Sequence, residues 1–265
     1  MKKYILVLAV FVMVSMGFVT INNETEAEKK GKEIFEKVLA VNDGNTRKSS
    51  MTIIKINRRG KKRVEKIVNL VKEGEVEKTL FFTTYPADVR GVGFLSFDYH
   101  EDGKDDDRWL YLPATKKTRR ISSAASRNEY FLGTDFTYRD AEKPEADEEK
   151  WIYVKDVNKE GVYYWEVERY ITDGESNYSK MVSLIDQSNH LIIETQYFDK
   201  RGELMKSAIA SGIKEINGFW TALETHMINH QKNHQTILKT ENIEFDIEID
   251  DHFFTVMALE NGVID

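Results

Sequence analysis

Three histidines recur at intervals of four residues near the C-terminal end of the chain: His226, His230 and His234. On a helix this spacing would place three imidazoles on one face, where they could hold a metal ion. The surrounding residues have the pattern of a strand, a turn and a second strand, and in that geometry the three side chains do not share a face. We therefore expect solvated histidines at a turn and no metal.

An acidic run, 101–107, offers carboxylates that could bind calcium. It lacks the alternating Asp positions and the late Glu of a calcium loop. Its Asp102-Gly103 pair is typical of a tight turn between two strands. We interpret the run as the exposed tip of a hairpin.

Motifs of catalysis and of cofactor binding are missing from the sequence. There is no Cys for a thiol nucleophile and no Gly-x-Ser-x-Gly. Gly91-Val92-Gly93 is not followed by a third glycine at dinucleotide-loop spacing. We expect neither enzymatic activity nor a cofactor.

A basic cluster, 116–120, follows an apparent strand and Pro113 and lies close in sequence to the aromatic residues Phe136 and Tyr138. One interpretation is that these cations blunt the edge of a sheet. The other is that arginines surround the mouth of a pocket and bind phosphate or carboxylate with their planar forks. The arginines of this second interpretation are Arg90, Arg119 and Arg120.

The N-terminus has the parts of a secretory signal peptide. Lys2 and Lys3 precede an apolar run, 4–19, and Thr25-Glu26-Ala27 supplies small residues for a signal peptidase. We expect residues 1–27 to be removed on export and 28–265 to form one domain in the periplasm. The alternative is a retained membrane anchor, although the run is shorter than the ~20 residues of a bilayer span.

Strand patterns dominate the remaining chain. A helix is expected at 28–42, where apolar residues recur at helical spacing, and another at 250–260. The segments 122–136 and 141–150 show neither period and read as irregular. The expected strands are 51–57, 63–72, 76–84, 92–99, 108–112, 151–157, 162–171, 180–186, 191–199, 204–216, 219–229 and 235–249.

Such a series of consecutive antiparallel strands must bury one apolar face, and the early helix and the irregular middle are suited to covering it. The chain is mainly β. Its net charge of −7 argues against nucleic acid as a partner.

Four segments resemble the outer-membrane lipoprotein-sorting protein family, which is related to the LolA carriers: DVRG (88–91), WLYLPA (109–114), RRISS (119–123) and GTDFTY (133–138). The resemblance extends over the chain after residue 27. It implies an incomplete antiparallel β-barrel, a half-pipe of about 11 strands, with an N-terminal helix and a helical lid. Proteins of this kind shield acyl chains, and some work beside inner-membrane exporters of the resistance–nodulation–division type.

The hypothesis is thus a monomeric periplasmic carrier for lipids or the acyl chains of lipoproteins, which takes part in outer-membrane lipoprotein sorting. Two rivals remain: an accessory subunit that docks an exporter, and a hydrolase that acts on a lipid ester. The residues expected to bind the ligand are Arg90, Arg119, Arg120, Trp109, Phe136, Tyr138, Val167, Ile193 and Phe245.

Overall fold

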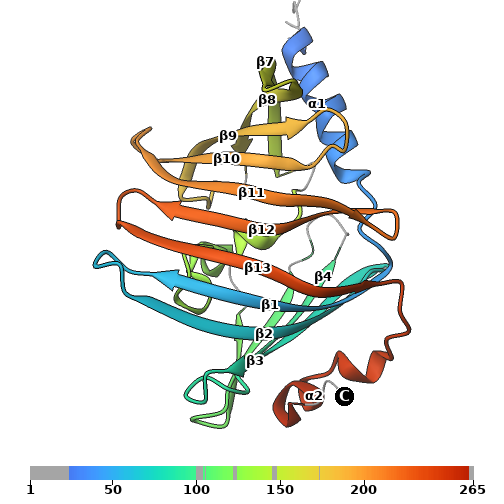
Figure 1. Cartoon of the computed structure of the whole chain (residues 1–265), viewed down its shortest axis with the longest axis vertical. Helices are drawn as coiled ribbons and strands as arrows, with labels where there is room; N and C mark the ends of the chain where they lie inside the picture. Colours follow the sequence, from blue (N-terminus) through green and yellow to red (C-terminus); the bar gives the residue numbers. More distant parts are fainter. Residues whose placement is uncertain are drawn as a thin grey trace, which may run out of the picture.

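The chain folds around a single antiparallel sheet that does not close into a barrel (Figure 1). The structure is a computed structural model that describes residues 24–99, 104, 106–121, 124–144, 148–172 and 174–262. The sheet has 13 strands in the order β6-β5-β4-β3-β2-β1-β13-β12-β11-β10-β9-β8-β7. This confirms the mainly β, incomplete-barrel fold expected from the sequence.

The strands follow the alternation of the sequence closely. Their bounds are β1 Thr46–Ile56, β2 Lys62–Lys72, β3 Val76–Tyr85, β4 Gly93–Tyr99, β5 Asp107–Leu112, β6 Lys117–Ile121, β7 Glu149–Lys159, β8 Val162–Ile171, β9 Tyr178–Asp186, β10 Ile192–Asp199, β11 Leu204–Ile216, β12 Phe219–Asn229 and β13 His234–Phe245.

The strand β6 is an element that sequence patterns missed. It consists of the basic residues interpreted above as a cluster following a strand, and it pairs with β5 from Arg108↔Ile121 to Leu112↔Lys117. Successive charged residues hide the alternation that marks a half-buried strand, whereas backbone pairing does not depend on it. A charged edge strand also resists pairing with another chain.

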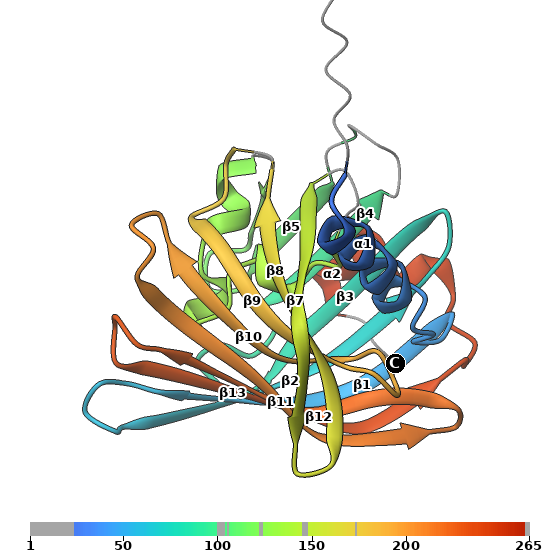
Figure 2. The ribbon, with the colours of Figure 1, turned by 90° about the horizontal axis from the view of Figure 1, so that it is seen from above.

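The two edge strands, β6 and β7, are joined by a segment with three short 3-10 helices: η1 Ala124–Asn128, η2 Phe131–Gly133 and η3 Arg139–Ala141. We call residues 124–144 the middle segment. Seen from above, it lies within the curl of the sheet (Figure 2). Its aromatic side chains pack against β1–β6 in one cluster and against β9–β13 in another.

The helix α1, Glu26–Leu39, covers the inner face at β7–β9. Thr25 caps it, because its hydroxyl accepts from the Glu28 backbone while the Glu28 side chain accepts from Thr25 in return. Its buried residues Ile34 and Phe35 pack on Trp151 of β7. The site predicted for signal-peptide cleavage, after Ala27, lies in the first turn of this helix; residues 1–23 lie outside the described part of the chain.

The C-terminal elements, η4 Asp251–Phe253 and α2 Val256–Asn261, pack on the outer face of β2–β5. Leu259 is fully buried there against Gly93, whose position has room for no side chain: a Cβ would lie 2.7 Å from a Leu259 methyl. The two faces of this half of the sheet are thus covered by different parts of the chain. None of the described helices is long and apolar enough to cross a bilayer.

Candidate functional site

The described residues form two cavities on the inner face of the sheet, with the middle segment between them. The larger has a volume of about 390 Å³ and the smaller about 260 Å³. Phe136, Asp140 and Glu142 of the middle segment contribute to the walls of both. A further hollow, with a volume of about 770 Å³, runs along α1 at the point where the described chain begins.

Apolar residues of five neighbouring strands form one wall of the larger cavity. They are Met51 and Ile53 of β1, Ile67 of β2, Phe81 of β3, Phe94 of β4 and Leu238 of β13. Period-2 alternation brings them together, because paired residues such as Ile53 and Leu238 point to the same face.

Aromatic rings of the middle segment close the larger cavity from the other side. Phe131 lies edge-on to Phe81 and Phe94, at centroid distances of 5.2 and 5.9 Å. Tyr138 stacks on Phe94 at 5.6 Å. These geometries are the favourable ones for aromatic pairs, so the segment is held by contacts specific to this wall.

The larger cavity also has a polar wall. Arg108 is buried there and its guanidinium pairs with Asp106 at 2.6 Å and Glu142 at 2.8 Å. Burial raises the pKa of the Asp98 carboxyl to about 6, against the opposing effects of the Ser96 hydroxyl and Arg108. The buried Oδ1 atom of Asn69 accepts no hydrogen bond from any described residue. A ligand with an apolar tail and a hydrogen-bonding end would match these two walls.

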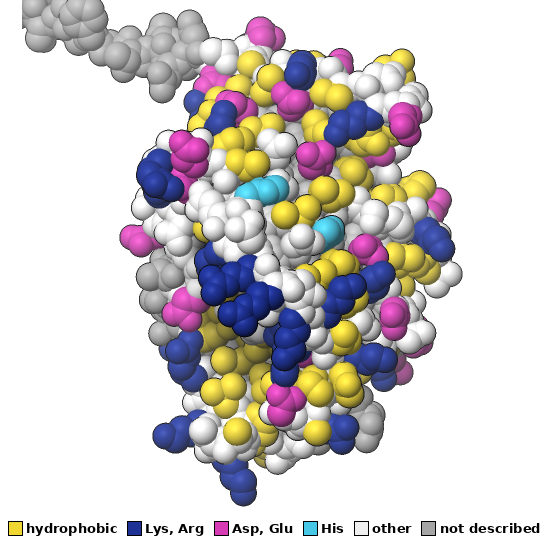
Figure 3. Space-filling model, turned by 60° about the vertical axis from the view of Figure 1, so that its left-hand side comes forward, with side chains coloured by type: hydrophobic (Ala, Val, Ile, Leu, Met, Phe, Trp, Pro, Cys, Tyr) yellow, Lys and Arg dark blue, Asp and Glu magenta, His cyan; other side chains and the backbone are white. Residues whose placement is uncertain are grey.

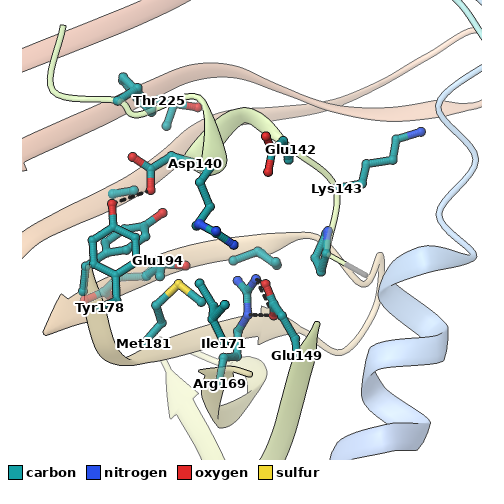
Figure 4. A pocket seen from close by; sticks show the side chains of 18 of the residues that line it. Asp140, Glu142, Lys143, Glu149, Arg169, Ile171, Tyr178, Met181, Glu194 and Thr225 are labelled. Carbon is teal, nitrogen blue, oxygen red and sulfur yellow. Dashed lines mark hydrogen bonds and ion pairs between the residues drawn. The ribbon is translucent and has the colours of Figure 1, made fainter. Parts of the chain in front are cut away.

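The smaller cavity is lined largely by charged and polar groups (Figure 4). Arg169 holds Glu149 in a two-pronged pair, with distances of 3.0 Å from Nε and 2.9 Å from Nη2. The Trp151 indole donates to the same carboxylate at 2.8 Å. Arg169 and Glu149 are thus paired with each other, as expected of residues that stabilise the fold.

A buried ion pair fixes the middle segment to the sheet. Lys206 of β11 has no exposed surface, and its ammonium pairs with Asp140 and donates to the Asp135 carbonyl at 3.2 Å. The rings of Tyr178 and Tyr197 lie 5.1 and 5.0 Å from that ammonium. Burial raises the pKa of both tyrosine hydroxyls far above the usual value, with the Asp140 carboxylate adding to the effect.

Sequence reasoning missed Lys206. The only available signal was a cation at an inward-facing position of a period-2 strand, in the sequence Met205-Lys206-Ser207-Ala208. Nothing local indicates its partner, because Asp140 lies 66 residues away along the chain.

Of the apolar residues predicted to bind a ligand, three line the cavities: Phe136 lines both, Tyr138 the larger and Ile193 the smaller. Val167 is fully buried in the cluster beneath α1. Phe245 stacks on Phe219 at 4.6 Å at the end of β13. Trp109 packs on the outer face against Phe97, at 5.5 Å, within the cluster that includes α2.

The three predicted arginines do not gather around one opening. Arg119 and Arg120 are consecutive in β6 and point to opposite faces, and Arg119 pairs with Glu129 at 3.2 Å while Arg120 pairs with Asp107. Arg90 lies in the β3–β4 turn, where its Nε donates to the Thr84 carbonyl at 3.1 Å.

The histidines each have a separate hydrogen-bond partner: His226 contacts Gln235 at 2.9 Å, His230 contacts Ser207 at 2.9 Å, and His234 contacts Asp135 at 2.7 Å. Throughout the described residues, no three potential metal ligands lie close enough to share an ion. Of the acidic run, residues 101–103 and 105 lie outside the described part of the chain.

Comparison with known proteins identifies a family and solved structures that this chain resembles. A family model described as "-like: Uncharacterized protein" matches residues 75–261. No curated protein sequence gives a significant match.

Three solved structures resemble the chain over most of its length. An outer membrane lipoprotein-sorting protein domain from Vibrio parahaemolyticus is 27% identical, with a TM-score of 0.81 over 88% of this chain and 99% of that one. A DUF1329 family protein from Desulfovibrio piger is 26% identical, with a TM-score of 0.83 over 89% and 100%. A LolA superfamily protein from Nitrosomonas europaea, 17% identical over 85% and 97%, has a TM-score of 0.66 and shares the fold.

Proposed function

The chain belongs to the LolA-like family of lipoprotein-sorting proteins, and on this premise we propose that it is a periplasmic carrier that binds a lipid, or the acyl chain of a lipoprotein, on its inner face. The observation that carries the proposal is the larger cavity. Its volume of about 390 Å³ lies in the range of ligand sites, which extends from about 300 to 1,000 Å³.

The energetics of an acyl chain suit such a cavity. Each methylene removed from water contributes ~0.8 kcal/mol, so ten would contribute ~8 kcal/mol before the entropy costs of binding. Roughly micromolar affinity is therefore the upper limit that ten methylenes alone could give, because the entropy costs of binding lower it. The polar wall with Asn69 and Asp98 would receive the hydrogen-bonding end of the ligand.

For an acidic head group, Arg119 is the candidate among the three predicted arginines, because it lies on the inner side of β6 opposite Leu110. Its exposed guanidinium already pairs with Glu129, so a ligand carboxylate or phosphate would compete with that contact. Arg119→Ala should weaken the binding of acidic lipids and leave neutral lipids unaffected.

The test is a titration of the protein with a fluorescent fatty acid, using two adjacent residues of β13. Leu238 lines the larger cavity, whereas Ile237 pairs with Ile54 on the outer face, and both are partly buried. We expect Leu238→Glu to weaken binding by at least about 30-fold, because it places a charge in the apolar wall. Ile237→Glu, which adds the same charge one residue away, should change affinity less than about threefold.

Single-site, saturable binding by the wild-type protein with this pattern supports the carrier. Equal effects of the two substitutions would place the ligand elsewhere. If the wild-type protein binds no acyl chain, the carrier proposal fails, and an accessory subunit that docks an exporter takes its place. The filling of the inner face by the middle segment favours that second candidate.

We further propose that the exported protein lacks the N-terminal signal segment, residues 1–27. Mass analysis of the protein from its host should give Glu28 as the first residue. Cleavage there removes Thr25, the cap of α1, so a mature end before Thr25 would instead preserve the cap and correct the predicted site.

A further inference from the structure

The hairpin formed by β1 and β2 carries an unusual concentration of positive charge. Within residues 58–66 every cationic side chain is exposed: Arg58, Arg59, Lys61, Lys62, Arg63 and Lys66. The chain as a whole has a net charge of −7, so this hairpin opposes the overall sign. Figure 3 shows Lys and Arg side chains gathered on the side of the molecule toward which this hairpin projects.

Most of these cations have no acidic partner among the residues that the structure describes. The single carboxylate of the hairpin, Glu65, is buried and already pairs with Lys55 and Arg63, both at 2.7 Å. Arg63 also pairs with Asp88 at 2.8 Å. The other five exposed cations form no ion pair with any residue that the structure describes.

The neighbouring turns extend this basic surface. The β1–β2, β3–β4 and β5–β6 turns lie at the same end of the antiparallel strands, and we call this surface the basic edge. The β3–β4 turn adds the exposed Arg90, and the β5–β6 turn adds Lys116 next to Lys117. The two turns are adjacent, because a Cβ on Gly91 would lie 3.7 Å from the ring of Pro113.

Exposed apolar groups lie among the cations. Tyr85 is 51% exposed and is the register partner of Lys66, and Val64 is 37% exposed between Lys62 and Lys66 on the same face of β2. Aromatic and aliphatic groups beside long cationic side chains are typical of surfaces that meet the headgroup region of a bilayer.

The opposite end of the strands carries acidic residues together with cations that pair with some of them. Glu73 of the β2–β3 turn pairs with Lys143 at 2.6 Å, and Asp251 after β13 pairs with Lys72 at 3.1 Å and Lys78 at 2.9 Å. A negatively charged surface would therefore attract the end with the β1–β2 hairpin more strongly than this one, so it would orient the molecule as well as bind it.

We propose that the basic edge, formed by the β1–β2 hairpin with the β3–β4 and β5–β6 turns, docks onto a membrane surface that carries anionic phospholipid headgroups. Clusters of four to eight Lys and Arg residues bind such surfaces through additive, salt-sensitive attraction. The inference does not depend on whether the cavity binds an acyl chain, because the basic edge lies outside the cavity walls.

The test is vesicle flotation with the protein purified from its host. We compare vesicles of phosphatidylcholine with mixed vesicles of phosphatidylcholine and phosphatidylglycerol, at low and high salt. The protein should float with the mixed vesicles at low salt, and Arg58→Glu/Arg59→Glu should weaken this binding by at least about 30-fold. The control, Lys159→Glu/Lys214→Glu, makes the same change in net charge at exposed positions of β7 and β11. It also breaks the ion pair of Lys159 with Glu194, and it should have less than a threefold effect on vesicle binding.

Circular dichroism and urea denaturation of each variant establish that it is folded. The proposal is overturned if wild-type protein does not distinguish the two kinds of vesicle, or if the two double variants lose binding equally. It is also overturned if the hairpin variant keeps vesicle binding but loses binding to an acidic protein of the envelope, since the basic edge would then be a protein interface.

Discussion

The two halves of the inner face hold the same middle segment in different ways. Against β3 and β4 the segment is held by rings, with Phe131 and Tyr138 on Phe81 and Phe94. Against β11 it is held by charge, through Lys206 and its buried partner Asp140. The ring-lined half encloses the larger cavity and the charged half the smaller one.

Under the proposed function, this difference would separate the residues that hold the middle segment in place from the residues that bind a ligand. A buried ion pair is specific, because a charge that loses its partner in the interior is costly. Aromatic and aliphatic walls are more tolerant, since similar apolar contacts can form with a ligand in place of the segment. We infer that the charged half fixes the segment while the apolar half is available to a ligand.

The largest effect is expected for Lys206→Met, which removes the cation that holds the middle segment to β11. The substitution leaves the Asp140 carboxylate buried, and we expect it to lower the free energy of unfolding by ~3–5 kcal/mol, measured by urea denaturation. Asp140 would keep its contacts with the Tyr178 hydroxyl at 2.9 Å and the Thr137 amide at 2.7 Å.

The control is the double variant Lys206→Met/Asp140→Asn, which removes both charges. It should recover at least ~1 kcal/mol of the loss, because no unpaired charge remains buried. If the single and double variants are equally unstable, then lost packing is responsible and the charged anchor is not.

A smaller effect is expected on the apolar side. Phe131→Ala removes the edge-on contacts with Phe81 and Phe94 and should cost ~2–3 kcal/mol of stability, less than a fully buried ring because Phe131 is partly exposed. Affinity for the fluorescent fatty acid should be unchanged or higher, since the deletion enlarges the larger cavity.

Phe97→Ala provides the comparison on the outer face, where Phe97 meets Trp109 edge-on. It should also reduce stability, with no gain in fatty-acid affinity. A loss of affinity in Phe131→Ala alone would indicate that the ring contacts the ligand instead of occupying its place.

The smallest expected effect concerns the polar wall. The pKa of Asp98 is raised from 3.8 to about 6 in the folded protein, mainly by burial. Its contribution to stability is therefore fully present below the unfolded pKa and is lost as pH rises through the folded pKa.

Asp98→Asn should accordingly be more stable than the wild type by ~1–2 kcal/mol above about pH 7 and equal to it below about pH 4. The full rise in pKa would correspond to ~3 kcal/mol. We expect a smaller difference in stability because the Asp98 side chain is 32% exposed and solvent screens its charge. Urea denaturation across this pH range measures the difference. A stability difference that does not vary with pH would assign the effect to packing.

Much of the fold could be predicted from local pattern. Alternation placed the strands, turn residues such as Asn217-Gly218 separated them, and helical spacing placed α1. Three of the residues expected to bind a ligand, Phe136, Tyr138 and Ile193, line the cavities, and they stood out in the sequence as large apolar side chains in their segments. A side chain's type and its alternation are properties that the local chain carries by itself.

The remaining features depended on tertiary structure. Strand register decided that consecutive Arg119 and Arg120 point to opposite faces, because a step of one residue reverses a side chain's direction. The docking of α1 decided that Val167 is buried beneath a helix. The curl of the sheet decided that Lys206 meets Asp140, and contacts between distant segments follow from how the strands pair and bend, which no single stretch of sequence specifies.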